Sequence, residues 1–152
     1  MGLRAANKPL LDSEGFALGL VVKSEFNTAK QEIRVSKDDI DVREYERYEL
    51  TLLVTGTVKD IQISLFAGSV LNDAIEYKGV KKIPVYNRLT SLALSLDIVE
   101  TDELKNSIDA EIVKRVEKSL LDLAGKKLKF KLGKFEGKAL TVPVANTFKF
   151  TD

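Results

Sequence analysis

The segment from Ser107 to Phe150 reads SIDAEIVKRVEKSLLDLAGKKLKFKLGKFEGKALTVPVANTFKF, and it decides the fold. In its first part, apolar residues recur at spacings of four and three, which is the single stripe of an amphipathic helix: Ile108, Ile112, Val116, Leu120 and Leu123. Gly125 follows the last of them, where a helix can end in a left-handed residue at no steric cost. The pattern therefore predicts one long helix that ends at Ala124.

The second part of the segment alternates between lysine and apolar residues, as the two faces of a β-strand do. Residues 127–132 read KLKFKL, so the apolar residues are expected to face the core and the lysines to face solvent: Lys127, Lys129 and Lys131. The short segment 133–137 suits a hairpin loop. A closing strand is predicted over 139–145, with three apolar residues facing inward: Leu140, Val142 and Val144.

The first half of the chain contains one well-marked antiparallel pair, formed by residues 47–57 and 60–67. Before it, 1–15 shows no periodicity and is expected to be an arm or loop. Residues 16–22 predict a strand, and 32–36 predict a second strand that pairs with it. The charged run 36–47 is typical of a solvated connection, and its three aspartates lack the spacing and turn glycine of a calcium loop.

The middle of the chain is less regular. Residues 77–86 predict a turn that enters an edge strand, because Pro84 cannot donate a hydrogen bond to a central ladder. Residues 87–99 fit two patterns: a helix capped by Asn87, and a strand with alternating leucines. The good helix formers after Asn87 favour the helix.

Composition limits the classes of function. With 152 residues, 44% hydrophobic and 31% charged, the chain is expected to be a single soluble domain. It has no cysteine and no histidine, which excludes thiol nucleophiles, catalytic triads that need histidine, and the usual zinc sites. No phosphate-binding glycine loop or nucleophile elbow is present. We therefore expect no enzyme, no metal and no cofactor.

No apolar run is long enough for a membrane span, which predicts a cytoplasmic protein, in the host cell if viral.

The order of predicted elements is that of an α+β domain dominated by antiparallel strands. It matches an OB-like five-stranded barrel with one long helix before the last two strands. The barrel is expected to occupy 47–150, with an N-terminal arm and extra strands in 1–46. The segment Leu123-Ala-Gly-Lys-Lys-Leu-Lys-Phe-Lys131, with its glycine hairpin and closing apolar strand, resembles the single-stranded DNA-binding proteins of bacteriophages. That resemblance implies a role in DNA replication or recombination. The acidic C-terminal tail common in bacterial members is missing.

The distribution of charge also favours a nucleic-acid partner. Net charge is only +1, but from Lys126 to Phe150 seven lysines accompany a single acidic residue, Glu136. Binding a single strand requires cations that follow the phosphates and aromatic rings on which bases stack. The candidate binding residues lie in two segments: Lys127, Lys129, Lys131, Lys134, Phe135 and Lys138 in the basic strand and its loop, and Tyr77, Lys78, Lys81, Lys82, Tyr86 and Arg88 in the middle.

The sequence thus predicts a non-catalytic protein that binds single-stranded nucleic acid, with DNA favoured over RNA and self-association as an additional expectation. Exposed lysines on a strand can instead have a purely structural role, in which they keep the edge of a sheet soluble and prevent it from pairing with another strand. The alternative is therefore a viral structural or protein-interaction domain built on a β-barrel. Its sequence would show the same mixed charge and the same lack of motifs.

Overall fold

Two long antiparallel strands form the centre of the fold. In the computed structural model, β1 runs from Ala17 to Ser36 and β2 from Asp39 to Val54, joined by a tight turn. The structure describes residues 5–72, 75–78, 81–84, 86–105, 108–133 and 142–151, with the backbone alone for 75–78 and 81–84. Both strands are longer than the sequence pattern predicts, because their pairing continues far beyond the part that packs on the core.

The central pair belongs to a five-stranded sheet with the order β3-β2-β1-β6-β9. β3 (Ile61–Gly68) pairs with β2, β6 (Lys127–Phe130) pairs with β1, and β9 (Lys149–Phe150) pairs with β6. All of these pairings are antiparallel. Two short ladders stand apart from the sheet: β4 (Ile75–Lys78) with β5 (Lys81–Pro84), and β7 (Leu132–Gly133) with β8 (Val142–Pro143).

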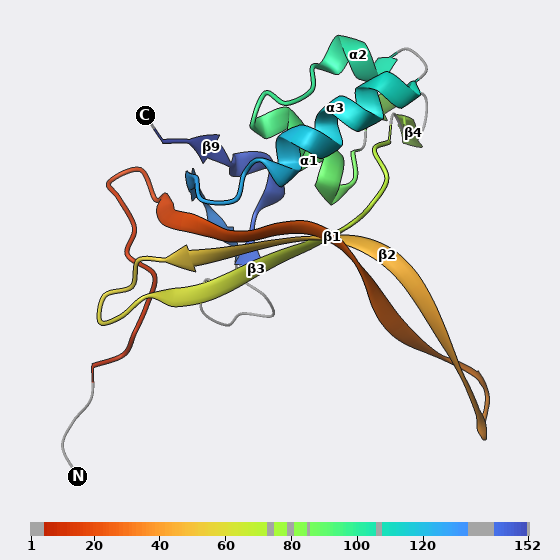
Figure 1. The fold of residues 1–152 in the computed structure, drawn as a ribbon, viewed down its shortest axis with the longest axis horizontal. Helices are drawn as coiled ribbons and strands as arrows, with labels where there is room; N and C mark the ends of the chain where they lie inside the picture. Colours follow the sequence, from red (N-terminus) through yellow and green to blue (C-terminus); the bar gives the residue numbers. More distant parts are fainter. Residues whose placement is uncertain are drawn as a thin grey trace.

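The helices lie together on one side of the sheet (Figure 1). They are α1 (Arg88–Ser95), α2 (Thr101–Lys105) and α3 (Ala110–Leu121), and a short 3-10 turn, η1 (Ala145–Thr147), packs against α1. We call this side of the sheet the helix-side face and the other its outer face. The core lies on the helix-side face, where the fully buried side chains include Leu50, Leu52, Leu92, Leu120, Phe130 and Phe148.

Alternation along the strands assigns side chains to the two faces. On β2, Tyr48, Leu50, Leu52 and Val54 are all fully buried, as the sequence pattern predicts. Gly19 on β1 lies opposite Val54 on β2. A Cβ atom at Gly19 would come within 3.1 Å of Leu52 and of the Phe130 ring. A Cβ atom here would push Leu52 or Phe130 aside by a few tenths of an ångström, so glycine favours the close approach of β6 and its aromatic ring to the central strands.

Helix α3 is attached to the sheet at its C-terminal end. Asp109 caps its start by accepting a hydrogen bond from the backbone of Ile112. The helix ends at Leu121, before the predicted end at Ala124, while Gly125 adopts the predicted left-handed backbone with a φ of 85°. The Gly125 amide then donates to the carbonyl of Val21 at 2.8 Å. The Ser24 hydroxyl donates to the Leu120 carbonyl and contacts the Tyr48 hydroxyl, so a buried polar link joins sheet and helix.

The expectation of a closed five-stranded OB-like barrel over 47–150 is wrong. Within the described residues no ladder joins the edge strands β3 and β9, so the sheet stays open. The strand expected in 80–99 does not enter the sheet, because 81–84 pair with 75–78 and 88–95 form helix α1, capped by Asn87. Closing a barrel needs strands whose number, tilt and stagger are consistent, and a two-residue β9 cannot complete that arrangement.

Three local expectations are also corrected. Residues 16–22 and 32–36 do not pair with each other, since both belong to β1. The charged run 36–47 is not a loose connection, because from Asp39 onward it is strand β2. In the closing strand the phase is reversed, since Pro143 is buried while Val142 is 37% exposed. Leu140 lies outside the described residues.

Candidate nucleic-acid interface

A cluster of lysines gathers around one aromatic ring at the β6–β9 edge of the sheet. The ammonium groups of Lys129, Lys131 and Lys149 lie 5.4, 5.1 and 5.1 Å from the centroid of the Phe16 ring. Phe16 is only 8% exposed, so the lysines stand over a ring that is otherwise buried. A cation within about 6 Å of an aromatic face is attracted to it, which holds three amines in one place. We call these four residues the lysine cluster.

Two lysines of the cluster lie close enough to repel each other, and a bound anion would reduce that repulsion. Lys129 and Lys149 are direct cross-strand partners, and like charges in such positions repel. Among the described residues none of the three lysines forms a salt bridge. Asp12 interacts with the cluster: the pKa of its carboxyl is lowered chiefly by the backbone N–H of Phe16 and also by the charge of Lys129. The Asp12 carboxylate accepts hydrogen bonds from the backbone amides of Glu14 and Phe16, both at 2.9 Å.

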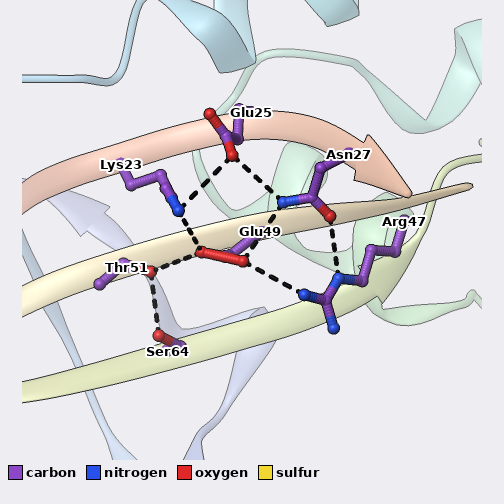
Figure 2. A network of polar contacts seen from close by, with 7 residues as sticks. All are labelled: Lys23, Glu25, Asn27, Arg47, Glu49, Thr51 and Ser64. Carbon is purple, nitrogen blue, oxygen red and sulfur yellow. Dashed lines mark hydrogen bonds and ion pairs between the residues drawn. The ribbon is translucent and has the colours of Figure 1, made fainter. Parts of the chain in front are cut away.

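The outer face also carries a polar network on β1, β2 and β3 (Figure 2). Its centre is Glu49, which is 8% exposed although no described helix covers this face. Glu49 is 3.2 Å from the amine of Lys23 and 3.4 Å from the guanidinium of Arg47. Asn27 and Thr51 also donate to it, at 3.3 and 3.2 Å. The carboxylate is thus fully partnered and does not present free negative charge to a ligand.

These contacts control the ionisation of Glu49. Desolvation raises the pKa of this carboxyl, but the hydrogen bonds from Lys23, Asn27 and Thr51 and the charge of Lys23 outweigh it, so the pKa lies below its ordinary value of 4.5. The same pairing raises the pKa of Lys23. Both groups are therefore charged at neutral pH, and they fix the position of Arg47, whose Nε donates to Asn27 at 2.9 Å.

A second feature, which includes Arg47, lies at the opposite edge of the sheet. Its guanidinium lies 4.3 Å from the centroid of the Phe66 ring, and Arg88 at the start of α1 donates to the Phe66 carbonyl at 2.7 Å. Phe66 is 40% exposed and Tyr45 is 45% exposed. Together with Ala67 and Gly68 these residues line a shallow depression of about 390 Å³, which we call the aromatic depression. It combines exposed rings with two cations.

The structure places the sequence-predicted residues in several locations. It brings Lys129 and Lys131 together, with Lys127 exposed on the same face and opposite Leu20. Arg88 lies at the aromatic depression instead, and Tyr86 is half-buried against the core. Tyr77, Lys78, Lys81 and Lys82 belong to the β4–β5 hairpin, of which only the backbone is described. Lys134, Phe135 and Lys138 lie outside the described residues.

Several residues of this surface could not be recognised from the sequence. Phe16 and Lys149 join the lysine cluster only because β1, β6 and β9 pair, and that pairing links segments far apart in the chain. Phe66 did give a signal, since it is an apolar residue in the outward phase of a strand whose other outward residues are polar, Gln62 and Ser64. Without a register, that signal could not be tied to Arg47.

Other kinds of site receive no support from the described part of the chain. There, no group of three or more acidic side chains is placed to hold a metal ion. No described helix is long and apolar enough to cross a membrane. The carboxylates Asp102 and Glu103 are paired with Lys105 and Arg115, as surface ion pairs usually are. No protein-family model matches the chain, and no curated protein or solved structure is significantly similar to it.

Proposed function

We propose that this protein binds single-stranded nucleic acid, DNA in preference to RNA, along the outer face of its sheet, and that it serves replication or recombination without catalysing a reaction. The observation that carries the proposal is the lysine cluster. Three ammonium groups converge on one ring, two of them as direct cross-strand partners, without a salt bridge in the described chain. A phosphate backbone relieves that repulsion and releases counterions when it binds.

The aromatic depression supports a single strand over a duplex. Bases of a single strand are free to stack on exposed rings, whereas those of a duplex are already stacked on one another. Phe66 and Tyr45 offer such rings, and Arg47 and Arg88 offer cations beside them.

The order of strands gives the length of the binding path. The lysine cluster is at the β9 edge and the aromatic depression is at the β3 edge, so four strand spacings separate the two edges. At about 4.8 Å per spacing, this is roughly 19 Å across the sheet. Phe66 lies level with Glu25 of β1 and Lys129 lies opposite Leu18, which adds about 20 Å along the strands. The diagonal path is roughly 28 Å and, with about 3.4 Å per nucleotide of one strand, holds about eight nucleotides. Oligonucleotides shorter than this length should bind much more weakly than longer ones.

The proposal is tested by fluorescence anisotropy with a labelled oligothymidine and a duplex of equal length, over a series of salt concentrations. Replacing Lys129 and Lys149 by glutamine should flatten the slope of log K against log salt by about 1.4, since each single-strand phosphate contact contributes about 0.7. The matched control replaces Lys114 and Lys118, which are exposed on α3, and changes net charge equally. The proposal fails if the parent does not bind single strands at low salt, or if both double variants have the same slope.

A further inference from the structure

The distal half of the β1–β2 hairpin extends beyond the rest of the sheet as a two-stranded ribbon (Figure 1). We call residues 28–46 the arm; this segment is not the N-terminal arm that the sequence predicts. Pairing with β3 begins only at Arg47, and pairing with β6 does not pass Leu20. The arm nevertheless exposes large apolar side chains, including Val35 at 64%, Ile40 at 54% and Val42 at 53%. A two-stranded ribbon alone is marginally stable in water, so this surface is suited to a partner.

An apolar groove lies at the root of the arm, on its helix-side face. Its volume is about 510 Å³, and it is lined by Phe26 of β1 and by residues of the helices and their connections, among them Leu89, Ile108, Val113 and Val116. Val113 is 44% exposed, so the groove is open to solvent. Ile40 and Val42 lie on the same face of the ribbon as Phe26, because Arg34 pairs with Ile40, Glu32 with Val42 and Phe26 with Tyr48.

The charges that β1 places on this face are self-complementary: Lys30, Glu32 and Arg34 alternate in sign at successive positions. On β2, Glu44 lies opposite Lys30, and Glu46 lies at the root of the arm beside the groove. If a second arm is laid antiparallel on the first, Glu32 meets Lys30 of the second copy and Arg34 approaches its Glu46. Ile40 then reaches the groove. Such reciprocal contacts are those of a two-fold symmetric interface.

We propose that a second copy of this chain docks on the helix-side face of the arm, with the two arms antiparallel and Ile40 of each in the groove of the other. Residues 28–46 carry six carboxylates and four cations, which disfavours nucleic acid as the occupant. The pairing leaves the lysine cluster uncovered on the outer face. The dimer therefore does not depend on the proposed nucleic-acid binding, and each can fail without the other.

The first test measures molar mass by sedimentation equilibrium over a range of concentrations. The parent should dimerise reversibly. Ile40→Asp should weaken dimerisation at least about tenfold, because an apolar contact is lost twice in a symmetric pair. The control is Ile33→Asp, which adds the same charge on the outer face of the ribbon, where Ile33 pairs with Asp41, and it should dimerise like the parent. A monomeric parent, or equal loss of dimer in both variants, overturns the proposal.

The second test uses charge reversal and does not depend on the folding of a single variant. Lys30→Glu and Glu32→Lys each place like charges together twice, so each variant alone should be mainly monomeric. In an equimolar mixture, the two variants restore both opposite-charge contacts, and heterodimers should form with about the affinity of the parent. Recovery shows that both variants are folded and that the arms are antiparallel. Two stable, folded variants that do not recover dimerisation on mixing overturn the proposed arrangement.

Discussion

Glu49 provides the sharpest link between the stability of this fold and its proposed function. Replacing Glu49 by glutamine removes the negative charge that holds Lys23 and Arg47 but keeps the shape of the side chain. Fully exposed ion pairs contribute about 0.2–1 kcal/mol, and loss of one partner from a buried pair costs about 3–5 kcal/mol. Here the carboxylate is shielded, but the Lys23 and Arg47 side chains are 46% and 27% exposed. We therefore expect Glu49→Gln to lower the free energy of unfolding by about 1–3 kcal/mol at neutral pH.

The loss must depend on pH, with a defined sign. The pKa of Glu49 is lower in the folded protein than its ordinary value of 4.5. Its contribution to stability is then fully present above that value and is lost as pH falls through the folded pKa. Carboxylates other than Glu49 titrate in both proteins and cancel in the comparison. The difference between parent and variant should therefore be constant from about pH 7 to pH 5 and should shrink towards about pH 3.

The assay is urea denaturation of both proteins at each pH, followed by circular dichroism. The same variant should bind a single-stranded oligonucleotide about two- to fivefold more tightly at low salt, because Glu49 no longer neutralises the charges of Lys23 and Arg47. A stability difference that stays the same at acid pH would refute the argument, since Glu49 would then act through packing and not through charge.

Three further variants test the core and the binding face. Leu120→Ala should cost about 2–5 kcal/mol of stability, because this side chain is fully buried on α3; an unchanged denaturation midpoint would contradict its place in the core. Phe66→Ala should cost about 1–3 kcal/mol of single-strand affinity with little change in melting temperature, whereas Phe148→Ala, stacked on Phe130, should do the reverse. Gly125→Ala should cost about 1–2 kcal/mol because of the left-handed backbone, and a neutral result would mean that the turn relaxes.

The parts of the fold that the sequence predicts correctly are those with a local signal. The stripe before Gly125 gives α3, and the cap at Asn87 resolves the ambiguity of the following leucines in favour of α1. The apolar alternation of 47–67 gives the pairing of β2 with β3. In each case neighbouring residues decide the structure, either through a hydrogen bond within one turn or through a repeat that buries one face.

Only residues 32–36 of the arm are predicted as a strand from the sequence, because the arm has no core to bury. Alternation reveals a strand only when one face is apolar, and the arm carries charged residues on the face that also carries Ile40 and Val42. Its backbone hydrogen bonds are satisfied by pairing of β1 with β2 alone, which leaves no hydrophobic period to read. For the same reason, residues 36–47 resemble a solvated loop in sequence. Only part of the lysine cluster can be predicted from the sequence. The pattern of β6 predicts exposed lysines, but it cannot indicate that Phe16 and Lys149 join them.

The assignment of the two faces depends on one extra residue in β1. Val21 lies opposite Leu52 and Lys23 opposite Thr51, so Val22 has no partner and forms a bulge. Before the bulge the odd-numbered residues face the core, and after it the even-numbered residues Ser24 and Phe26 do. An uninterrupted period of two from Ala17 would instead bury Lys23 and expose Ser24. The bulge thus turns Phe26 and Lys30 of β1 towards the helix side. On β2 the alternation is unbroken from Val54, and it places Ile40 on the same side and Arg47 on the outer face. Association and nucleic-acid binding are consequently proposed on opposite faces, and a variant of one face tests one function alone.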